Sequence, residues 1–274
     1  MNRLVKWSVY GAVPLCLSLA LQLMYFSGNL VLQRLVCPKL PPLPPDAYRE
    51  FGLLENLQSL FVLAMVIILL IGAIRSVHRI QRVVFVALTL FSTFIFLEEI
   101  DYGTHFYAYA QLEDVAGWFE PARSDRFQAL LAQSDFTATP FNLHNRGDLT
   151  DVIKGVAGAV MLLLFVVAPF LTGRIKNPWF HYLAPDRFTV ITVVVMVVLR
   201  LVTHQLGNLD AQWAAMPLPD GGASTREVGA MNNNLSEFRE LTTYYLFLVY
   251  LAVVVFFRRA PEHTVSGDET PQPS

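Results

Sequence analysis

Six apolar stretches, each about as long as a bilayer's hydrocarbon core is thick, constrain this 274-residue chain more than any other feature. A helix needs about 20 residues to cross about 30 Å of hydrocarbon at 1.5 Å per residue. The stretches lie at residues 8–33, 52–74, 82–106, 151–172, 187–207 and 236–257. They predict an all-α, polytopic membrane protein, a bundle of about six transmembrane helices in a single domain over residues 1–259.

The composition agrees with this fold class. Apolar residues make up 54% of the chain and charged residues only 15%, whereas soluble domains carry about 25% charged residues. Residues 260–274 are rich in Pro, Glu, Ser, Thr and Gly and predict a disordered tail. A net charge of −2 without a basic stripe gives no reason to expect a nucleic-acid partner, so the bilayer is the expected surrounding.

The charges predict how the bundle is oriented. Residues 1–7, 75–81, 173–186 and the tail fall on one side of the six stretches, and 18 of the 22 acidic residues fall elsewhere. The first side carries Arg3, Lys6, Arg75, Arg79, Arg174, Lys176, Arg258 and Arg259, with Arg82 and Arg187 at the adjoining helix ends. Because basic residues stay cytoplasmic, both termini are expected in the cytoplasm and the larger loops outside.

Polar residues end the third stretch. Glu98, Asp101 and His105 share one helical face at spacings of three and four residues, and Glu99 points about 100° away. Glu98 lies 16 residues after Arg82, about 24 Å along the helix, which places it in the outer leaflet. Adjacent carboxylates at that depth are costly unless they are paired, protonated or bound to a cation.

The neighbouring stretches bring further polar groups to the same depth. Arg200 lies in a Val/Leu-rich span and therefore needs an anionic partner or water. These residues predict a pocket at the outer end of the bundle, lined by Glu98, Glu99, Asp101, His105, His144, Arg200, His204 and Glu240. Two interpretations stay open: a buried ion-pair network that fixes helix packing, or a site for a cation, an anionic headgroup or a substrate.

Four of these residues suggest a metal. Glu98, Asp101, His105 and His144 form a nitrogen and oxygen ligand set suited to zinc or another divalent ion, with Glu99 then free to pair with Arg200. Their spacing matches no metal motif such as HExxH. The sequence therefore leaves the cofactor open.

Two motifs carry a resemblance to known proteins. Glu98-Glu99-Ile100-Asp101-Tyr102-Gly103 and Asn142-Leu143-His144-Asn145 resemble the E-E-I-S-W-G-Q-like helix end and following N-L-H-N of a group of uncharacterised bacterial polytopic membrane proteins. Asp101, Tyr102 and Thr104 depart from the Ser, Trp and Gln of that pattern. The resemblance implies that the two motifs work in one site. With a bacterial inner membrane as the expected location, the charge pattern makes this site face the periplasm.

Three functions are compatible with this pattern. The first is a non-enzymatic membrane protein whose pocket binds an ion, a lipid headgroup or a membrane-protein partner. The second is a divalent-metal-dependent intramembrane hydrolase or transferase. The third is an ion- or proton-coupled transporter, which the unbroken apolar inner halves of several stretches disfavour because conduction needs polar lining throughout. Whether the protein is an enzyme stays open.

Overall fold

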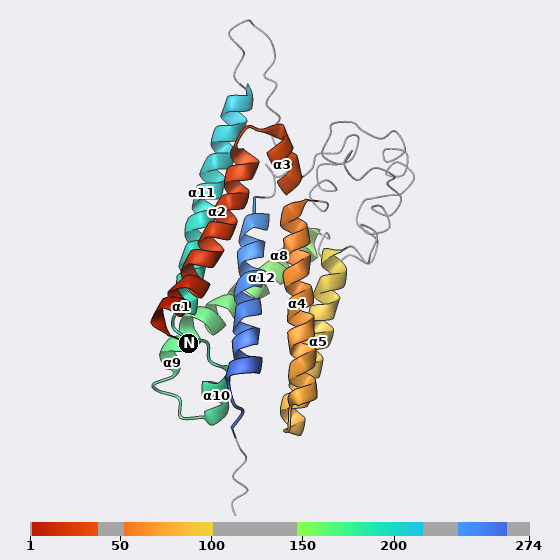
Figure 1. The fold of residues 1–274 in the computed structure, drawn as a ribbon, viewed down its shortest axis with the longest axis vertical. Helices are drawn as coiled ribbons and strands as arrows, with labels where there is room; N and C mark the ends of the chain where they lie inside the picture. The colour runs from red at the N-terminus through yellow and green to blue at the C-terminus, as the bar shows by residue number, and fades with distance from the viewer. Residues whose placement is uncertain (1, 38–51, 101–146, 216–234, 262–274) are drawn as a thin grey trace, which may run out of the picture.

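The structure, a computed structural model, describes residues 2–37, 52–100, 147–215 and 235–261, and all secondary structure in these ranges is helical. Six helices are long and apolar enough to cross a membrane. They are Arg3–Phe26, Leu53–Arg75, Arg79–Glu99, Val152–Leu171, Thr189–Leu209 and Glu237–Phe257. The predicted all-α fold with six such helices is therefore confirmed for the described residues (Figure 1).

Several of these helices consist of consecutive segments. The elements are α1 (Arg3–Trp7), η1 (Ser8–Ala12), α2 (Val13–Phe26), α3 (Leu30–Val36), α4 (Leu53–Arg75), α5 (Arg79–Glu99), α8 (Gly147–Met161), η6 (Leu162–Val167), α9 (Ala168–Leu171), α10 (Pro178–Leu183), α11 (Thr189–Ala215), α12 (Glu237–Ala252) and η8 (Val253–Phe257). The η segments are π-helical turns inside longer helices.

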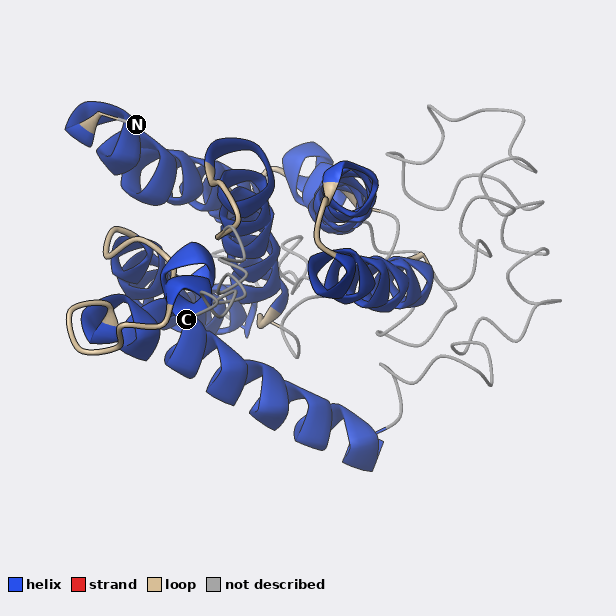
Figure 2. Cartoon of the chain, turned by 90° about the horizontal axis from the view of Figure 1, so that it is seen from below, coloured by secondary structure: helices blue, strands red, loops and turns tan. Residues whose placement is uncertain are grey.

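Helix α12 is the centre of the bundle. It contributes Leu241 to a core cluster with α2, α3 and α4, and Leu251 to a second cluster with α4, α5 and α10. It also contributes Leu246 to a third cluster with η1, α8 and η6. Helix α5 packs on α4 at the edge of the bundle, and α8 runs obliquely across the other helices (Figure 1). Figure 2 shows α8 from below, with its N-terminal end away from the bundle.

The first apolar stretch is not one helix to residue 33. Helix α2 ends at Phe26, and Gly28 has a positive φ of 76°, a conformation that costs glycine little because it has no Cβ. Asn29 then caps a new helix, α3, by accepting hydrogen bonds from the amides of Val31 and Leu32. Apolar residues on both sides of this break conceal it in a reading by hydropathy alone.

Two prolines explain two of the π-helical turns and the contacts made there. Pro14 and Pro169 lack the amide that would donate to the carbonyls of Tyr10 and Phe165, four residues earlier. Helix α11 supplies donors: Thr192 Oγ1 donates to Tyr10 O at 2.6 Å, and Thr189 Oγ1 lies 3.0 Å from Phe165 O and shares its hydrogen with Asp186 O at 2.7 Å. In an apolar environment these bonds stabilise the packing of α11, because an unpaired carbonyl would be costly.

The end of the molecule that holds the N-terminus is rich in cations. Lys6 pairs with Asp186, in the segment before α11, and Arg258 donates to the carbonyls of Tyr182 and Ala184, both at 2.7 Å. Burial raises the pKa of Asp186, but hydrogen bonds from Lys6 and from the Phe188 amide outweigh it and leave that pKa below its usual value. These contacts fix the short connections at this end.

Candidate functional site

Acidic side chains gather where α4 and α12 begin and α5 ends. Glu55, Glu98 and Glu237 are buried, with 8%, 8% and 3% of their surface exposed. Glu55 lies in the first turn of α4, and Glu237 and Glu240 lie in the first turn of α12, where the helix dipole favours a negative charge. Carboxylates from α4, α5 and α12 thus lie at one end of these helices.

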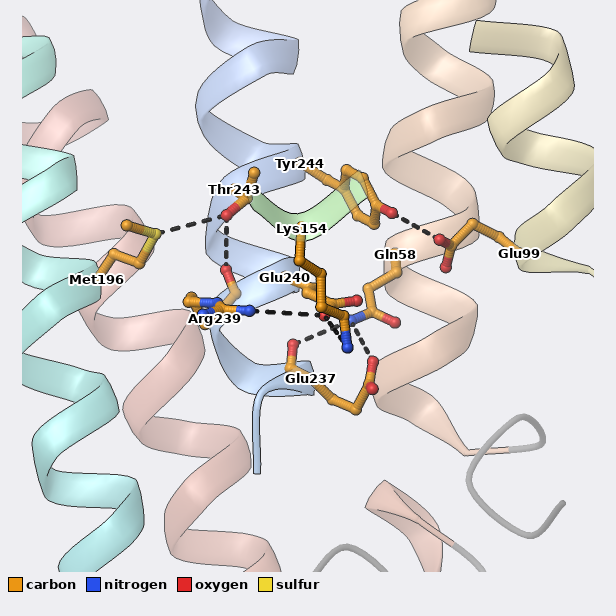
Figure 3. Close-up of polar contacts among 9 residues, drawn as sticks. All are labelled: Gln58, Glu99, Lys154, Met196, Glu237, Arg239, Glu240, Thr243 and Tyr244. Atoms are coloured by element: carbon orange, nitrogen blue, oxygen red, sulfur yellow. Dashed lines mark hydrogen bonds and ion pairs between the residues drawn. The ribbon is translucent and has the colours of Figure 1, made fainter. Parts of the chain in front are cut away.

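The side chain of Gln58 joins α4 to α12. Its Nε2 donates to the Glu237 carbonyl at 2.9 Å and lies 3.4 Å from Glu237 Oε2 (Figure 3). Because both of these atoms are acceptors, the amide cannot be turned around without losing the contacts. Its other end, Oε1, is buried and has no hydrogen-bond partner, and the whole residue is 0% exposed.

Glu240 is the second group with an unpaired buried atom. Its Oε1 lies 3.9 Å from Lys154 Nζ and 3.9 Å from Arg239 NH2, close enough for charge attraction and too far for a hydrogen bond (Figure 3). The Glu240 side chain is 14% exposed, whereas the Lys154 side chain is 36% exposed. Two cations, one on α8 and one on α12 itself, therefore attract the same carboxylate oxygen, and neither forms a hydrogen bond with it.

Tyr244 connects the site to α5. Its phenol donates a 2.6 Å hydrogen bond to Glu99 Oε1 (Figure 3). Glu99 is in the last turn of α5, where the helix dipole disfavours a negative charge, so a donor at this position offsets that cost. Helices α4, α5, α8 and α12 together surround the polar cluster of Gln58, Glu99, Lys154, Glu237, Arg239, Glu240 and Tyr244.

Three atoms in the described residues are buried without a hydrogen bond: the side-chain oxygens Gln22 Oε1, Gln58 Oε1 and Glu240 Oε1. Gln22 belongs to a neutral contact, since its Nε2 donates to Thr203 Oγ1 at 2.7 Å. The other two belong to the polar cluster in Figure 3. Leaving such acceptors unpaired costs about 1–3 kcal/mol each, more for a charged group. A donor or a cation at this position would relieve that cost.

The predicted pocket residues have different outcomes. Glu98, Glu99 and Glu240 come to the same end of the bundle. Asp101, His105 and His144 lie outside the described residues. Arg200 and His204 lie on α11 with exposed side chains, and within the described ranges neither has a hydrogen bond or an ion pair.

The expected pairing of Arg200 with Glu99 is therefore not seen. The buried stripe of α11 runs through Thr192, Leu199 and Thr203. Arg200 follows Leu199 by one residue, a rotation of about 100° that turns it away from the stripe. The prediction assumed that an arginine in an apolar span faces the bundle, and here the helical phase set by the buried threonines decides otherwise.

The metal prediction gains no support from the residues that can be compared. No group of three His, Cys, Asp or Glu side chains within residues 2–37, 52–100, 147–215 and 235–261 is arranged to hold a metal ion. Of the proposed zinc ligands, only Glu98 lies in these ranges.

The predicted lining did not include Gln58, a polar residue at the expected depth, or Tyr244. Both follow from helical phase. Gln58 continues the buried stripe Leu54, Gln58, Val62, Met65 and Leu69 of α4, and Tyr244 lies one turn after Glu240 on the same face of α12. A polar residue inside an apolar stripe was the available signal.

Comparison with known proteins identified no relative of the chain. No protein-family model matches the chain, and no match was found among curated proteins or solved structures.

Proposed function

We propose that this protein is an integral membrane protein that binds a small monovalent cation at Glu240, in the polar cluster between α4, α5, α8 and α12. The observation that carries the proposal is the pair of unpaired buried oxygens, Gln58 Oε1 and Glu240 Oε1. Oxygen donors suit small hard cations. The three carboxylates of the cluster, Glu99, Glu237 and Glu240, and its two cations, Lys154 and Arg239, leave a formal charge of −1, which matches one positive charge.

The surroundings of the cluster favour binding over conduction. Along α4 and α12, the space towards the other end of the bundle is filled by apolar side chains, among them Val62, Met65, Leu69, Leu251 and Val254. An ion path would need polar groups there. We therefore rank transport below binding. The metal-dependent hydrolase depends on Asp101, His105 and His144, and no described contact favours it.

We further propose that the protein resides in a bacterial inner membrane with both termini in the cytoplasm, so that the cluster faces the periplasm. Ten of the fourteen described Lys and Arg residues lie at the end that holds the N-terminus, where Asp186 is the one acid among the described residues. They are Arg3, Lys6, Arg75, Arg79, Arg82, Arg174, Lys176, Arg187, Arg258 and Arg259. Such a bias supports a cytoplasmic position for this end.

Thermal melting of the purified protein in Na⁺, Li⁺ or K⁺ tests the binding proposal, with choline chloride keeping the ionic strength constant. A ligand that binds only the folded state raises the melting temperature. We expect at least one alkali cation to do so in the wild type and not in Glu240→Gln. Gln22→Leu is the matched control, since it removes a buried glutamine with an unpaired oxygen outside the cluster and should keep the cation effect. Identical cation responses of the wild type and Glu240→Gln would overturn the proposal.

A further inference from the structure

We infer that the Lys154 ammonium group and the bound cation compete for Glu240 and exclude one another there. Binding of the cation therefore releases α8 from α12. The inference rests on the proposed function. It adds Lys154 as the residue that lowers the affinity for the cation, and a movement of α8 that accompanies binding.

Glu240 Oε1 is the atom for which the charges compete. Lys154 approaches it from α8 and Arg239 from α12, each at 3.9 Å. Arg239 is on the same helix as Glu240 and stays near it in any arrangement of the bundle. Lys154 is on another helix and moves with it. A third positive charge at this oxygen would be repelled by both cations, and only Lys154 can withdraw by a movement between helices.

Around Lys154, α8 has few constraints. Val152, Ile153, Val156 and Val160 are all exposed, at 61%, 42%, 59% and 45%. A Cβ atom added at Gly155 or Gly158 would have no neighbour within 4 Å. The side chain of Lys154 is the partly buried one in this stretch, residues 152–160. Its attraction to Glu240 is therefore a principal contact between this part of α8 and the described bundle.

The far end of α8 is fixed. Met161 and Phe165 pack with Leu246 of α12 in one core cluster, and the Phe165 carbonyl accepts the hydrogen bond from Thr189. The packed part begins at Met161 and continues through η6, which holds Phe165 and is followed by Pro169. The exposed part precedes it and contains Gly155 and Gly158, and glycine weakens a helix interior. Residues 152–160 can therefore move relative to the packed end at Met161 without disturbing the core.

These observations define the ligand by its chemistry. It must replace an ammonium group at the Glu240 carboxylate oxygen, so it carries one positive charge. Because linkage is reciprocal, whatever weakens the Lys154–Glu240 attraction strengthens binding of the cation. Lys154 thereby lowers the affinity of the wild-type protein.

Direct binding of radioactive Na⁺ to the protein in lipid nanodiscs tests the competition, at constant pH and with choline chloride balancing ionic strength. We expect Lys154→Gln to bind Na⁺ roughly tenfold more tightly than the wild type, a typical coupling between two sites. Lys176→Gln, which removes an exposed cation at the other end, should bind as the wild type does. Equal affinity in the wild type and Lys154→Gln would overturn the inference while leaving the proposed function intact. Binding that survives Glu240→Gln, or its absence from every protein, would overturn both.

The movement has its own test. Spin labels at Val156→Cys on α8 and Leu90→Cys on α5, both exposed positions, report the distance between these helices by pulsed electron resonance. The background carries Cys16→Ser and Cys37→Ser, after its helicity has been compared with the wild type. Saturating Na⁺ should change the distance distribution, and Lys154→Gln without Na⁺ should already show the changed distribution. A distribution that neither Na⁺ nor the substitution alters would overturn the release of α8.

Discussion

Thr192 Oγ1 donates a 2.6 Å hydrogen bond to the Tyr10 carbonyl, the carbonyl whose usual helical donor is missing because residue 14 is proline. The same helix repeats this arrangement at Thr189 and Phe165, four residues before Pro169. The hydroxyls of α11 thus serve as interhelical donors exactly where two other helices lack an amide, which ties local sequence to helix packing.

Removing the Thr192 hydroxyl should destabilise the fold. Thr192→Val leaves the Tyr10 carbonyl without this donor at nearly unchanged volume, and we expect a loss of about 1 kcal/mol. In a Pro14→Ala background the new amide can donate to that carbonyl, so the same substitution should cost less. Reversible unfolding in mixed micelles, followed by circular dichroism, measures this double-mutant cycle. Equal costs in the two backgrounds would show that the proline is not the reason for the bond.

Tyr244 should stabilise the contact between α5 and α12. Tyr244→Phe removes the hydrogen bond to Glu99 at the end of α5, and we expect a loss of about 1–3 kcal/mol because a partly buried carboxylate loses this donor. Tyr10→Phe is the control, since that hydroxyl makes no hydrogen bond with the described residues, and it should be close to neutral. The comparison uses unfolding midpoints in one detergent. Similar midpoints for the two variants would count against a bond between Tyr244 and Glu99.

Two glycines should respond to alanine in opposite directions. A Cβ at Gly52 would lie 2.0 Å from the Val36 carbonyl oxygen, so Gly52→Ala must displace the start of α4 from the end of α3. We expect a loss above 2 kcal/mol, in the range of severe overpacking. At Gly155 nothing lies within 4 Å, and alanine should raise helix stability by up to about 1 kcal/mol. Melting temperatures of both variants provide the measurement, and a neutral Gly52→Ala would contradict the close approach.

The Lys6–Asp186 pair should make stability depend on pH in the acidic range. The pKa of Asp186 lies below its usual value of 3.8, so the pair contributes stability above pH 3.8 that is lost as pH falls through the lower, folded-state pKa. Unfolding midpoints of wild type and Asp186→Asn should therefore differ at pH 6 and converge below pH 3. A difference that stayed constant over this range would rule out the stabilised carboxylate.

The proposed orientation can be tested with reporter fusions. A fluorescent protein that matures only in the cytoplasm, fused after residue 274, should fluoresce, whereas alkaline phosphatase at the same position should be inactive. Fusions truncated after residue 220, between the fifth and sixth spans, should give the opposite result. Matching results at both positions would contradict a crossing by the sixth span, and an inverted pattern would place the C-terminus outside.

The all-α class and the six long apolar helices could be predicted from the sequence, because length and hydropathy are local properties that need no knowledge of neighbours. The sequence also led to the expectation that Glu98, Glu99 and Glu240 share one end of the bundle, since each lies near the end of an apolar stretch. The break at Gly28 was missed because the residues on both sides of it are apolar.

Which polar residues come into contact depends on how the helices pack against one another. Arg200 was expected at the site because a charge in an apolar span is costly, but the rotation of α11 about its axis is set by Thr192 and Thr203, which bond to neighbouring helices. Gln58 enters the site because α4 packs on α12 in the register that brings its amide to Glu237. The rotation of a helix about its axis and its register with a neighbouring helix depend on contacts between residues distant in sequence. Hydropathy along the chain does not reveal these contacts.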